Sequence, residues 1–284
     1  SGIGSIRLTP TAALFAGVIF RTSLHRAKAR RTFLGNSSAP LRVAADLIEQ
    51  AGILAMRNTT AKARAALLRA RPQLIAMAEE HAGGVRPLGL GGRRDGALFV
   101  PDRLGATVSA PLIVALHGAG GVSSQMIDLL IKPAETCGIV LLAPESRERT
   151  WDVIRGAFGP DVSFIDRALQ AVFQHHAIDP DKIAVAGFSD GASYALSLGL
   201  TNGKLFSNIL AFSPGFMAPA QQDGEPRIFI SHGINDEVLP IDRCSRHLAP
   251  VLRKRGYSLD YREFDGGHTV PPEMVSAAIV SFLG

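Results

Sequence analysis

Short apolar segments alternate with longer amphipathic ones along the chain after residue 86. The apolar segments predict strands at residues 97–101, 111–118, 138–146, 182–188, 208–214, 227–233 and 257–264. Between them, apolar residues recur every three or four positions, which predicts helices at residues 123–137, 161–176, 189–200, 242–256 and 271–283. We expect Asp161 to be the N-cap of the second helix. The alternation predicts an α/β fold with a mostly parallel, doubly wound sheet.

The part of the chain before this pattern is different. From residue 41 to about residue 80 the apolar spacing is helical, with Thr59 or Thr60 as a candidate N-cap and a break or kink at Pro72. Residues 81–87, HAGGVRP, contain two glycines and a proline and form the best candidate linker. We therefore expect an N-terminal extension over residues 1–85, helical from about residue 41, and an α/β domain over residues 86–284.

Charge separates the same two regions. Residues 1–85 carry 12 Lys/Arg and 4 Asp/Glu, a net charge of +8, whereas residues 86–284 carry 18 and 21, a net charge of −3. A basic arm of this kind is typical of tails that meet nucleic acid, anionic lipid or a targeting receptor, and it also suits a surface arm. We do not expect a nucleic-acid partner. The N-terminal helices could cap the domain or form a homo-oligomer contact, and both alternatives stay open.

The first 31 residues bear on localisation. The apolar run at residues 8–20 would form a helix of about 20 Å, which is shorter than the roughly 30 Å hydrocarbon layer of a membrane. The positive charges follow this run instead of preceding it, which disfavours a signal peptide, while the Arg-rich composition suits a transit peptide. We expect a cytoplasmic protein, with an N-terminal targeting segment as the alternative. Cys137 and Cys244 match no zinc or redox spacing, and we expect no disulfide and no metal site.

One short motif carries chemistry. Residues 187–191 read Gly-Phe-Ser-Asp-Gly, which fits the pattern Gly-x-Ser-x-Gly, and they lie where a predicted buried strand ends and a helix begins. At such a junction a tight turn exposes the serine at the carboxyl edge of the sheet, and the glycines let strand and helix approach closely. Ser189 is therefore the candidate nucleophile.

A serine hydroxyl needs a base, and a third group has to orient that base. Asp236 follows the predicted strand 227–233, and His268 follows the predicted strand 257–264, so both belong to loops at the edge that exposes Ser189. Asp265 is the second choice for the acid. The other histidines lie on predicted helices or in the extension, except His232, which we expect to brace the acid loop, and His117, which we expect to shape a turn.

Acyl transfer also needs donors for a developing oxyanion. Residues 116–121, LHGAGG, follow a predicted strand and leave backbone N–H groups free in a loop that leads to a helix. The amides of Ala119 and of Asp190, the residue after the serine, are the expected pair. The loop lacks the Lys-Ser/Thr of a phosphate-binding P-loop, which disfavours that alternative.

Residues 88–284 resemble α/β-hydrolase serine esterases of the phospholipase/carboxylesterase type. The resemblance rests on four segments in this order: LHGAGG, GFSDGASYAL, SHGINDEVLP and GGH. The group also includes acyl-protein thioesterases, feruloyl esterases and polyhydroxybutyrate depolymerase-like proteins. The resemblance implies an α/β-hydrolase fold and a carboxylic-ester or thioester hydrolase that needs no metal or organic cofactor. Dienelactone hydrolases also look similar, but their nucleophile is a cysteine. Residues 1–85 match nothing in the family.

These observations predict hydrolysis of small to medium acyl or aryl esters through an acyl-enzyme. Trp151 and Phe158 lie in a long loop that follows a strand at the same edge, and we expect them to line the substrate pocket. An acyl thioesterase or lysophospholipase is the closest alternative. An inactive binding protein with the same fold is disfavoured by the intact Ser, Asp and His set, and a peptidase is disfavoured because no further domain or charged clamp is visible.

Overall fold

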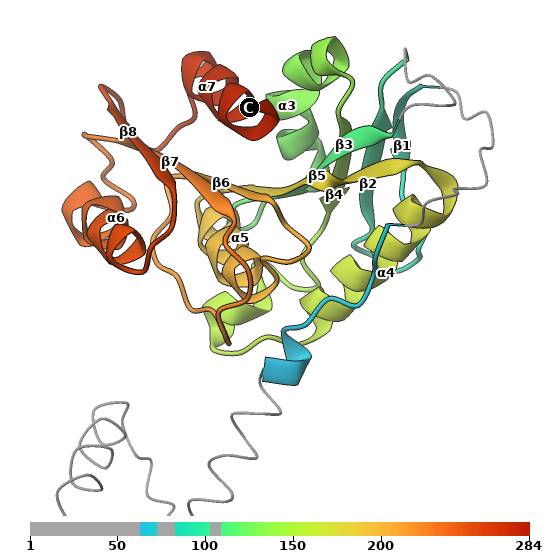
Figure 1. Cartoon of the computed structure of the whole chain (residues 1–284), viewed down its shortest axis with the longest axis horizontal. Coiled ribbons are helices and arrows are strands. Elements are labelled where there is room, and N and C mark those ends of the chain that lie inside the picture. Colours follow the sequence, from blue (N-terminus) through green and yellow to red (C-terminus); the bar gives the residue numbers. More distant parts are fainter. Residues whose placement is uncertain (1–62, 73–82, 103–108) are drawn as a thin grey trace, which may run out of the picture. The chain divides into compact units, whose positions relative to one another are not determined.

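The computed structural model describes residues 63–72, 83–102 and 109–284 of the chain. Residues 58–284 form one compact unit. Its centre is an eight-stranded sheet in the order β1-β2-β4-β3-β5-β6-β7-β8 (Figure 1). The pairs β1–β2 and β2–β4 are antiparallel and the other five pairs are parallel, so the mostly parallel sheet is confirmed.

The strands are β1 (Gly84–Pro87), β2 (Gly96–Val100), β3 (Ala110–Leu116), β4 (Val140–Pro144), β5 (Ile178–Phe188), β6 (Asn208–Phe212), β7 (Arg227–Gly233) and β8 (Leu259–Phe264). The α-helices of the described part that follow β3 are α3 (Ser123–Cys137), α4 (Pro160–His175), α5 (Asp190–Thr201), α6 (Ser245–Lys254) and α7 (Pro272–Leu283). Short 3₁₀ turns at Asp152–Arg155 and Ile241–Arg243 complete the regular structure. No helix among the described residues is long and apolar enough to cross a membrane.

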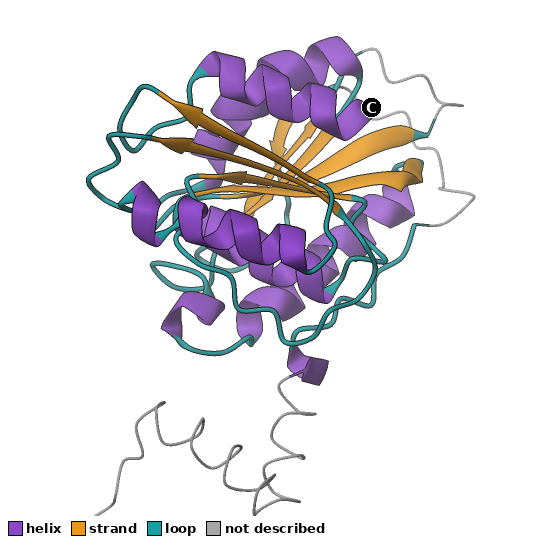
Figure 2. Ribbon diagram, turned by 60° about the vertical axis from the view of Figure 1, so that its left-hand side comes forward, coloured by secondary structure: helices purple, strands orange, loops and turns teal. Residues whose placement is uncertain are grey.

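Helices cover both faces of the sheet. Helices α3 and α7 lie on one face, and α4, α5 and α6 lie on the other (Figures 1 and 2). Along β3, Leu112, Val114 and Leu116 belong to the core under α4 and α5, whereas Ile113 and Ala115 belong to the core under α3 and α7. A strand with apolar side chains on both faces is stable only between two helical layers, which explains the continuous apolar runs.

Two boundaries differ from the expectation. Residues 84–87, which we assigned to a linker, pair with β2 as the edge strand β1, so the compact unit begins before residue 86. Helix α4 begins at Pro160 with Gly159 as its N-cap, so Asp161 is not the cap. The carboxylate of Asp161 instead accepts hydrogen bonds from the backbone amides of Arg147 and Asp152, in the loop that precedes the helix.

Residues 63–72 correct the prediction of a continuous helix up to Pro72. Only residues 63–65 are helical, and residues 67–72 have no regular structure. In this segment, which we call the strap, Ala66, Leu68 and Ala70 are buried, an alternation that a helix could not produce. The backbone is held by side chains of the body: Asn202 pairs with Leu68 and Ala66, and Asp166 accepts from the amides of Arg69 and Ala70. Residues 1–62 and 73–82 of the expected extension lie outside the described residues.

Candidate active site

Ser189 lies at the sharp turn between β5 and α5. Its backbone has φ 58° and ψ −120°, a conformation that non-glycine residues rarely adopt and that costs of the order of 1–3 kcal/mol. A Cβ at residue 187 would overlap the backbone of residue 191, and a Cβ at residue 191 would overlap the carbonyl of Leu116. Both glycines are therefore required to bring α5 onto the sheet with the serine exposed at the strand end.

The structure brings Ser189, His268 and Asp236 together. His268 Nε2 lies 2.9 Å from Ser189 Oγ, and His268 Nδ1 lies 2.6 Å from Asp236 Oδ2. The three residues follow β5, β8 and β7, and parallel strands place these loops at one edge of the sheet. The ring of Phe188 packs on the His268 ring with 4.8 Å between centroids. Asp265, the second choice for the acid, accepts a hydrogen bond from the Asn235 side chain.

Asp236 is buried and held from several sides. The amides of Val238 and Leu239 donate to its Oδ1 at 2.9 and 2.8 Å. Burial alone would raise the pKa of this carboxyl, but the hydrogen bonds from the Leu239 amide and from His268 outweigh it, and the pKa lies below its ordinary value. Asp236 is therefore a carboxylate at neutral pH and can orient the imidazole of His268 and stabilise its cation.

A second histidine backs the acid. His232 is fully buried, and its Nε2 lies 2.8 Å from the Leu239 carbonyl and 3.2 Å from Asp236 Oδ2. Because the carbonyl can only accept, Nε2 carries a proton, and Nδ1 accepts from the hydroxyl of Ser245 at 2.7 Å. Burial is the main cause that lowers the pKa of His232, so the ring is neutral at pH 7. The expectation that His232 braces the acid loop agrees with these contacts.

An open pocket of about 540 Å³ lies beside Ser189 and His268. Its apolar lining comes from α3, from the last residue of β5 and from the loops after β7 and β8: Met126, Leu129, Phe188, Val238 and Val270. Ala119 lines it as well, and Asp190 is the first residue of α5, so its backbone N–H has no partner within the helix. Both predicted oxyanion donors thus lie in segments that border the serine.

Trp151 and Phe158 do not line this pocket, which corrects the expectation for both. Trp151 is fully buried; its indole N–H donates to the His117 carbonyl at 2.8 Å, and its ring stacks on Tyr194. Phe158 is half-buried and packs against Tyr194 as well, with 5.8 Å between the ring centroids. The long loop thus turns both aromatic side chains toward Tyr194 of α5 and the hydrophobic core, and not toward the pocket.

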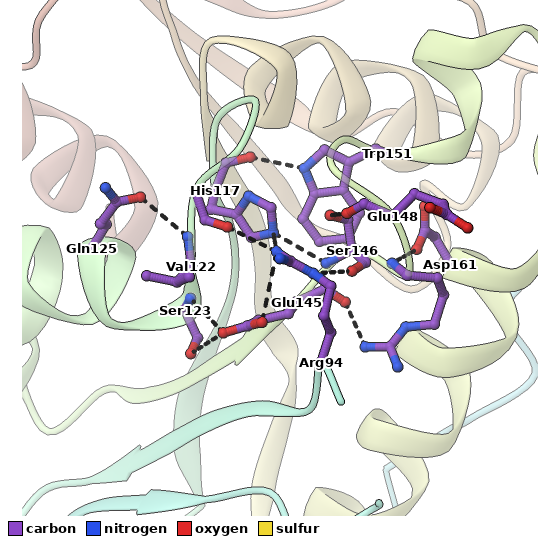
Figure 3. Close-up of polar contacts among 12 residues, drawn as sticks. Arg94, His117, Val122, Ser123, Gln125, Glu145, Ser146, Glu148, Trp151 and Asp161 are labelled. Atoms are coloured by element: carbon purple, nitrogen blue, oxygen red, sulfur yellow. Dashed lines mark hydrogen bonds and ion pairs between the residues drawn. The ribbon is translucent and has the colours of Figure 1, made fainter. Parts of the chain in front are cut away.

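Sequence reasoning did not identify the polar residues behind the loop 117–121. Arg94, Glu145 and Ser146 contact this loop or the start of α3 (Figure 3). No local motif marks them, because they come from different connections of the sheet. Among the described residues no group of three or more His, Cys, Asp or Glu side chains is arranged to hold a metal ion.

Comparison with known proteins identifies the family. Residues 140–283 match the phospholipase/carboxylesterase family of α/β-hydrolases, and the chain belongs to this family. The probable feruloyl esterase C of Aspergillus niger is 29% identical over 157 residues, which cover 52% of this chain and 57% of that protein. Acyl-protein thioesterase 1 of Gibberella zeae is 27% identical over 106 residues, covering 34% of this chain and 45% of that protein.

Solved structures agree on the fold. Esterase PE8 has a TM-score of 0.53 and 23% identity, covering 70% of this chain and 96% of the other. The Thermogutta terrifontis esterase Est2 has a TM-score of 0.57 and 16% identity, covering 71% and 94%. The α/β-hydrolase fold expected from the sequence is therefore confirmed. The matched region spans about 57% of the length of the feruloyl esterases.

Proposed function

We propose that the protein is a serine carboxylic-ester hydrolase that acts on small to medium acyl or aryl esters through an acyl-enzyme. The observation that carries the proposal is the chain of contacts from Ser189 Oγ through His268 to Asp236, at 2.9 and 2.6 Å. A hydroxyl, an imidazole and a carboxylate at hydrogen-bonding distance form the arrangement that activates a serine for attack on a carbonyl. Membership of the phospholipase/carboxylesterase family supports the same reaction.

In the proposed first step, Ser189 Oγ attacks the ester carbonyl while His268 Nε2 takes its proton. Asp236 accepts a hydrogen bond from His268 Nδ1, which keeps the lone pair on Nε2 and stabilises the imidazolium that forms. The carbonyl oxygen becomes an oxyanion, and the amides of Ala119 and Asp190 donate to it. The alcohol leaves with the proton from His268, and the acyl group stays on Ser189.

In the second step, His268 takes a proton from water while the water oxygen attacks the acyl-enzyme. The bond from the acyl carbon to Ser189 Oγ then breaks, the acid is released, and His268 returns the proton to Ser189 Oγ.

The substrate class follows from the residues that line the pocket. Its walls include Met126, Leu129 and Val270 and carry no lysine, arginine or carboxylate side chain. An uncharged acyl or aryl group fits such a surface, because transfer of apolar area from water is favourable by about 25 cal/mol per Å². The resemblance to feruloyl esterases points to aryl esters within this class.

The test is hydrolysis of p-nitrophenyl acetate and butyrate by the full chain and by Ser189→Ala. We expect the variant to lose turnover by about 10⁶-fold, the scale seen when a triad nucleophile is removed. Ser276→Ala is the matched control, because Ser276 lies exposed on α7 and bonds only to the carbonyl of Pro272. Equal hydrolysis by wild type and Ser189→Ala would rule the proposal out.

A thioesterase is the second candidate, favoured by the similarity to an acyl-protein thioesterase. The same triad attacks esters and thioesters, so the leaving group has to be varied at constant acyl chain. A panel of p-nitrophenyl acyl esters, methyl esters of hydroxycinnamic acids and acyl thioesters separates the two. A kcat/KM for acyl thioesters well above that for oxygen esters of equal chain length would favour the thioesterase.

A further inference from the structure

The guanidinium of Arg94 contacts the loop 117–121 from behind. Arg94 lies in the connection between β1 and β2, and its side chain is 23% exposed. Its Nη2 donates to the Gly121 carbonyl at 2.8 Å and to His117 Nε2 at 3.3 Å, and its Nε donates to the Ser146 carbonyl at 2.6 Å (Figure 3). The Glu145 carboxylate lies 3.6 Å from Nη2 and balances the charge. One planar group thus links both ends of the loop 117–121 to the two residues that follow β4.

These donors determine the protonation state of His117. His117 Nε2 also receives the amide of Ser146 at 3.0 Å. A backbone amide and a guanidinium can only donate, so Nε2 carries no proton and the ring hydrogen is on Nδ1. His117 Nδ1 therefore donates to the carbonyl of Gly118, 2.7 Å away. The ring is buried and acts as a neutral relay between Arg94 and the backbone of the loop.

The carbonyl of Gly118 and the N–H of Ala119 belong to the same peptide unit. The carbonyl accepts both from His117 Nδ1 and from the Gly121 amide at 3.0 Å, so its direction is fixed. The peptide unit is planar and trans, and its N–H therefore points opposite to its C=O. The carbonyl faces the buried side, where His117 lies, while residue 118 itself lies against the Cβ of Ser189. The Ala119 N–H is thereby directed to the side of the serine.

The other polar groups of the loop are used to hold it. The His117 carbonyl accepts from Trp151, the Gly120 amide donates to the Arg149 carbonyl at 2.7 Å, and the Gly121 carbonyl accepts from Arg94. The Ala119 N–H takes part in none of these bonds, which leaves it for a ligand. A donor that is fixed in place before the reaction stabilises an oxyanion without reorganisation during the reaction.

We propose that Arg94 is a positioning residue for the oxyanion-binding amide of Ala119, acting through His117 and the Gly121 carbonyl. The inference rests on the proposed function of Ser189, His268 and Asp236. Arg94 does not line the pocket and has no bond to the serine, and it lies outside residues 140–283, which match the family. Its role is to hold the loop in the one conformation that aims the amide at the carbonyl oxygen of a substrate.

The experiment compares wild type with Arg94→Ala and Arg94→Lys in the full chain. We expect Arg94→Ala to lower kcat for p-nitrophenyl butyrate by about 10–100-fold, approaching the loss of one oxyanion donor, with KM changed less than about 3-fold. An aryl trifluoromethyl ketone, which Ser189 converts into an oxyanion adduct, should lose affinity by the same factor as kcat. Lysine keeps the charge but cannot occupy two donor positions at once, so Arg94→Lys should recover only part of the rate.

Two controls separate positioning from general stability. Arg227→Ala removes an arginine that also donates to a main-chain carbonyl, that of Phe282, but at the start of β7 and far from the serine in the fold; kcat should stay unchanged. Added guanidinium chloride at millimolar concentration should restore activity to Arg94→Ala, and sodium chloride at equal ionic strength should not. If Arg94→Ala does not fold, kcat, KM and the affinity for the ketone are measured on Arg94→Lys instead.

An Arg94→Ala variant with wild-type kcat and wild-type affinity for the ketone would overturn the inference and leave the proposed function standing. So would a loss of kcat that Arg227→Ala reproduces, or one that merely follows the fraction of unfolded protein. A wild-type chain that neither hydrolyses esters nor binds the ketone would overturn the proposed function, and this inference with it.

Discussion

The two ends of helix α5 are built in opposite ways. At its amino end, Ser189 is held at φ 58°, and the first amides of the helix have no partner within it. At its carboxyl end, Asn202 is buried and every polar atom of its side chain is used: Oδ1 accepts from Leu68, and Nδ2 donates to the carbonyls of Ala66 and Leu198. Strain and unpaired groups lie where the reaction is proposed, and paired groups lie where the helix is anchored.

A ladder of hydroxyl groups joins the two ends. Ser193, Ser197 and Thr201 lie one turn apart on α5, and each donates to the carbonyl four residues earlier. Each also accepts a backbone amide of the loop after β6, from residues 215, 218 and 220. The helix thus binds this loop along its length and the strap at its end. A strained residue persists only when its surroundings over-determine it, and these bonds supply that support.

The largest expected effect comes from crowding the strained end. Gly191→Ala places a Cβ on the Leu116 carbonyl, so α5 has to move away from β3 and takes Ser189 with it. A displacement of about 1 Å can lower turnover by about 10²-fold, and we expect at least that loss in kcat for p-nitrophenyl butyrate. Gly138→Ala is the control, because a Cβ at residue 138 meets nothing within 4 Å, although its φ of 67° makes an alanine there strained. It should cost about 1 kcal/mol of stability and leave kcat unchanged.

Removing the side chain of Asn202 should lower the stability of the fold and leave kcat nearly unchanged. Asn202→Ala leaves the Leu68 amide and the Ala66 carbonyl unpaired in a buried place, and each costs about 1–3 kcal/mol. We expect the free energy of unfolding to fall by about 2–4 kcal/mol in urea titrations, with kcat within about 2-fold of wild type. Asn235→Ala, which removes one exposed bond to Asp265, should change stability by less than about 0.5 kcal/mol. A loss of kcat in folded Asn202→Ala would mean that the two ends are not independent.

A smaller effect is expected in the middle of the ladder. Ser197→Ala removes the acceptor of the Ala218 amide and should lower the free energy of unfolding by about 1 kcal/mol, since the loop is partly open to water. Ser276→Ala removes a hydroxyl with the same bond to the carbonyl four residues earlier but with no amide to accept. The midpoint of thermal unfolding should therefore fall further in Ser197→Ala, where the hydroxyl is buried and accepts the Ala218 amide, than in Ser276→Ala, where it is exposed. Equal midpoints would contradict a role of the ladder in holding the loop.

The sequence predicts the residues that lie in short motifs, and it does not predict those whose position depends on partners far away in the chain. Ser189, Asp236 and His268 each follow a strand within a short motif, and the parallel sheet brings such positions to one edge. Trp151 was misassigned because a tryptophan in a long loop has the same local sequence whether it faces a pocket or the core. The strap was misassigned because Asn202 and Asp166, which hold its backbone, lie far away in the sequence and override the helical spacing. Arg94 lies in no motif, and only its three-dimensional partners reveal it.

The dependence of stability on pH should distinguish the histidine that backs Asp236 from the asparagine at the carboxyl end of α5. Near the serine, burial lowers the pKa of His232, so the folded ring stays neutral while the unfolded ring takes up a proton near pH 6.5. The unfolded state then binds more protons, and the stability that His232 contributes is present above pH 6.5 and is lost as the pH falls below it. Asn202, at the other end, does not titrate.

We therefore expect urea titrations between pH 7 and pH 5 to show a shallower fall of stability in His232→Gln than in wild type, by up to about 1.4 kcal/mol per pH unit. Asn202→Ala should give a curve parallel to that of wild type, offset by a constant. Burial also lowers the pKa of His117 and raises that of Asp161 to about 6, and these two shifts change the stability with opposite signs. Both are present in all three proteins, so they cancel in the comparison of slopes. Parallel curves for His232→Gln and wild type would mean that the ring beside Asp236 is protonated in the folded state, which would contradict the neutral brace inferred from its contacts with Leu239 and Ser245.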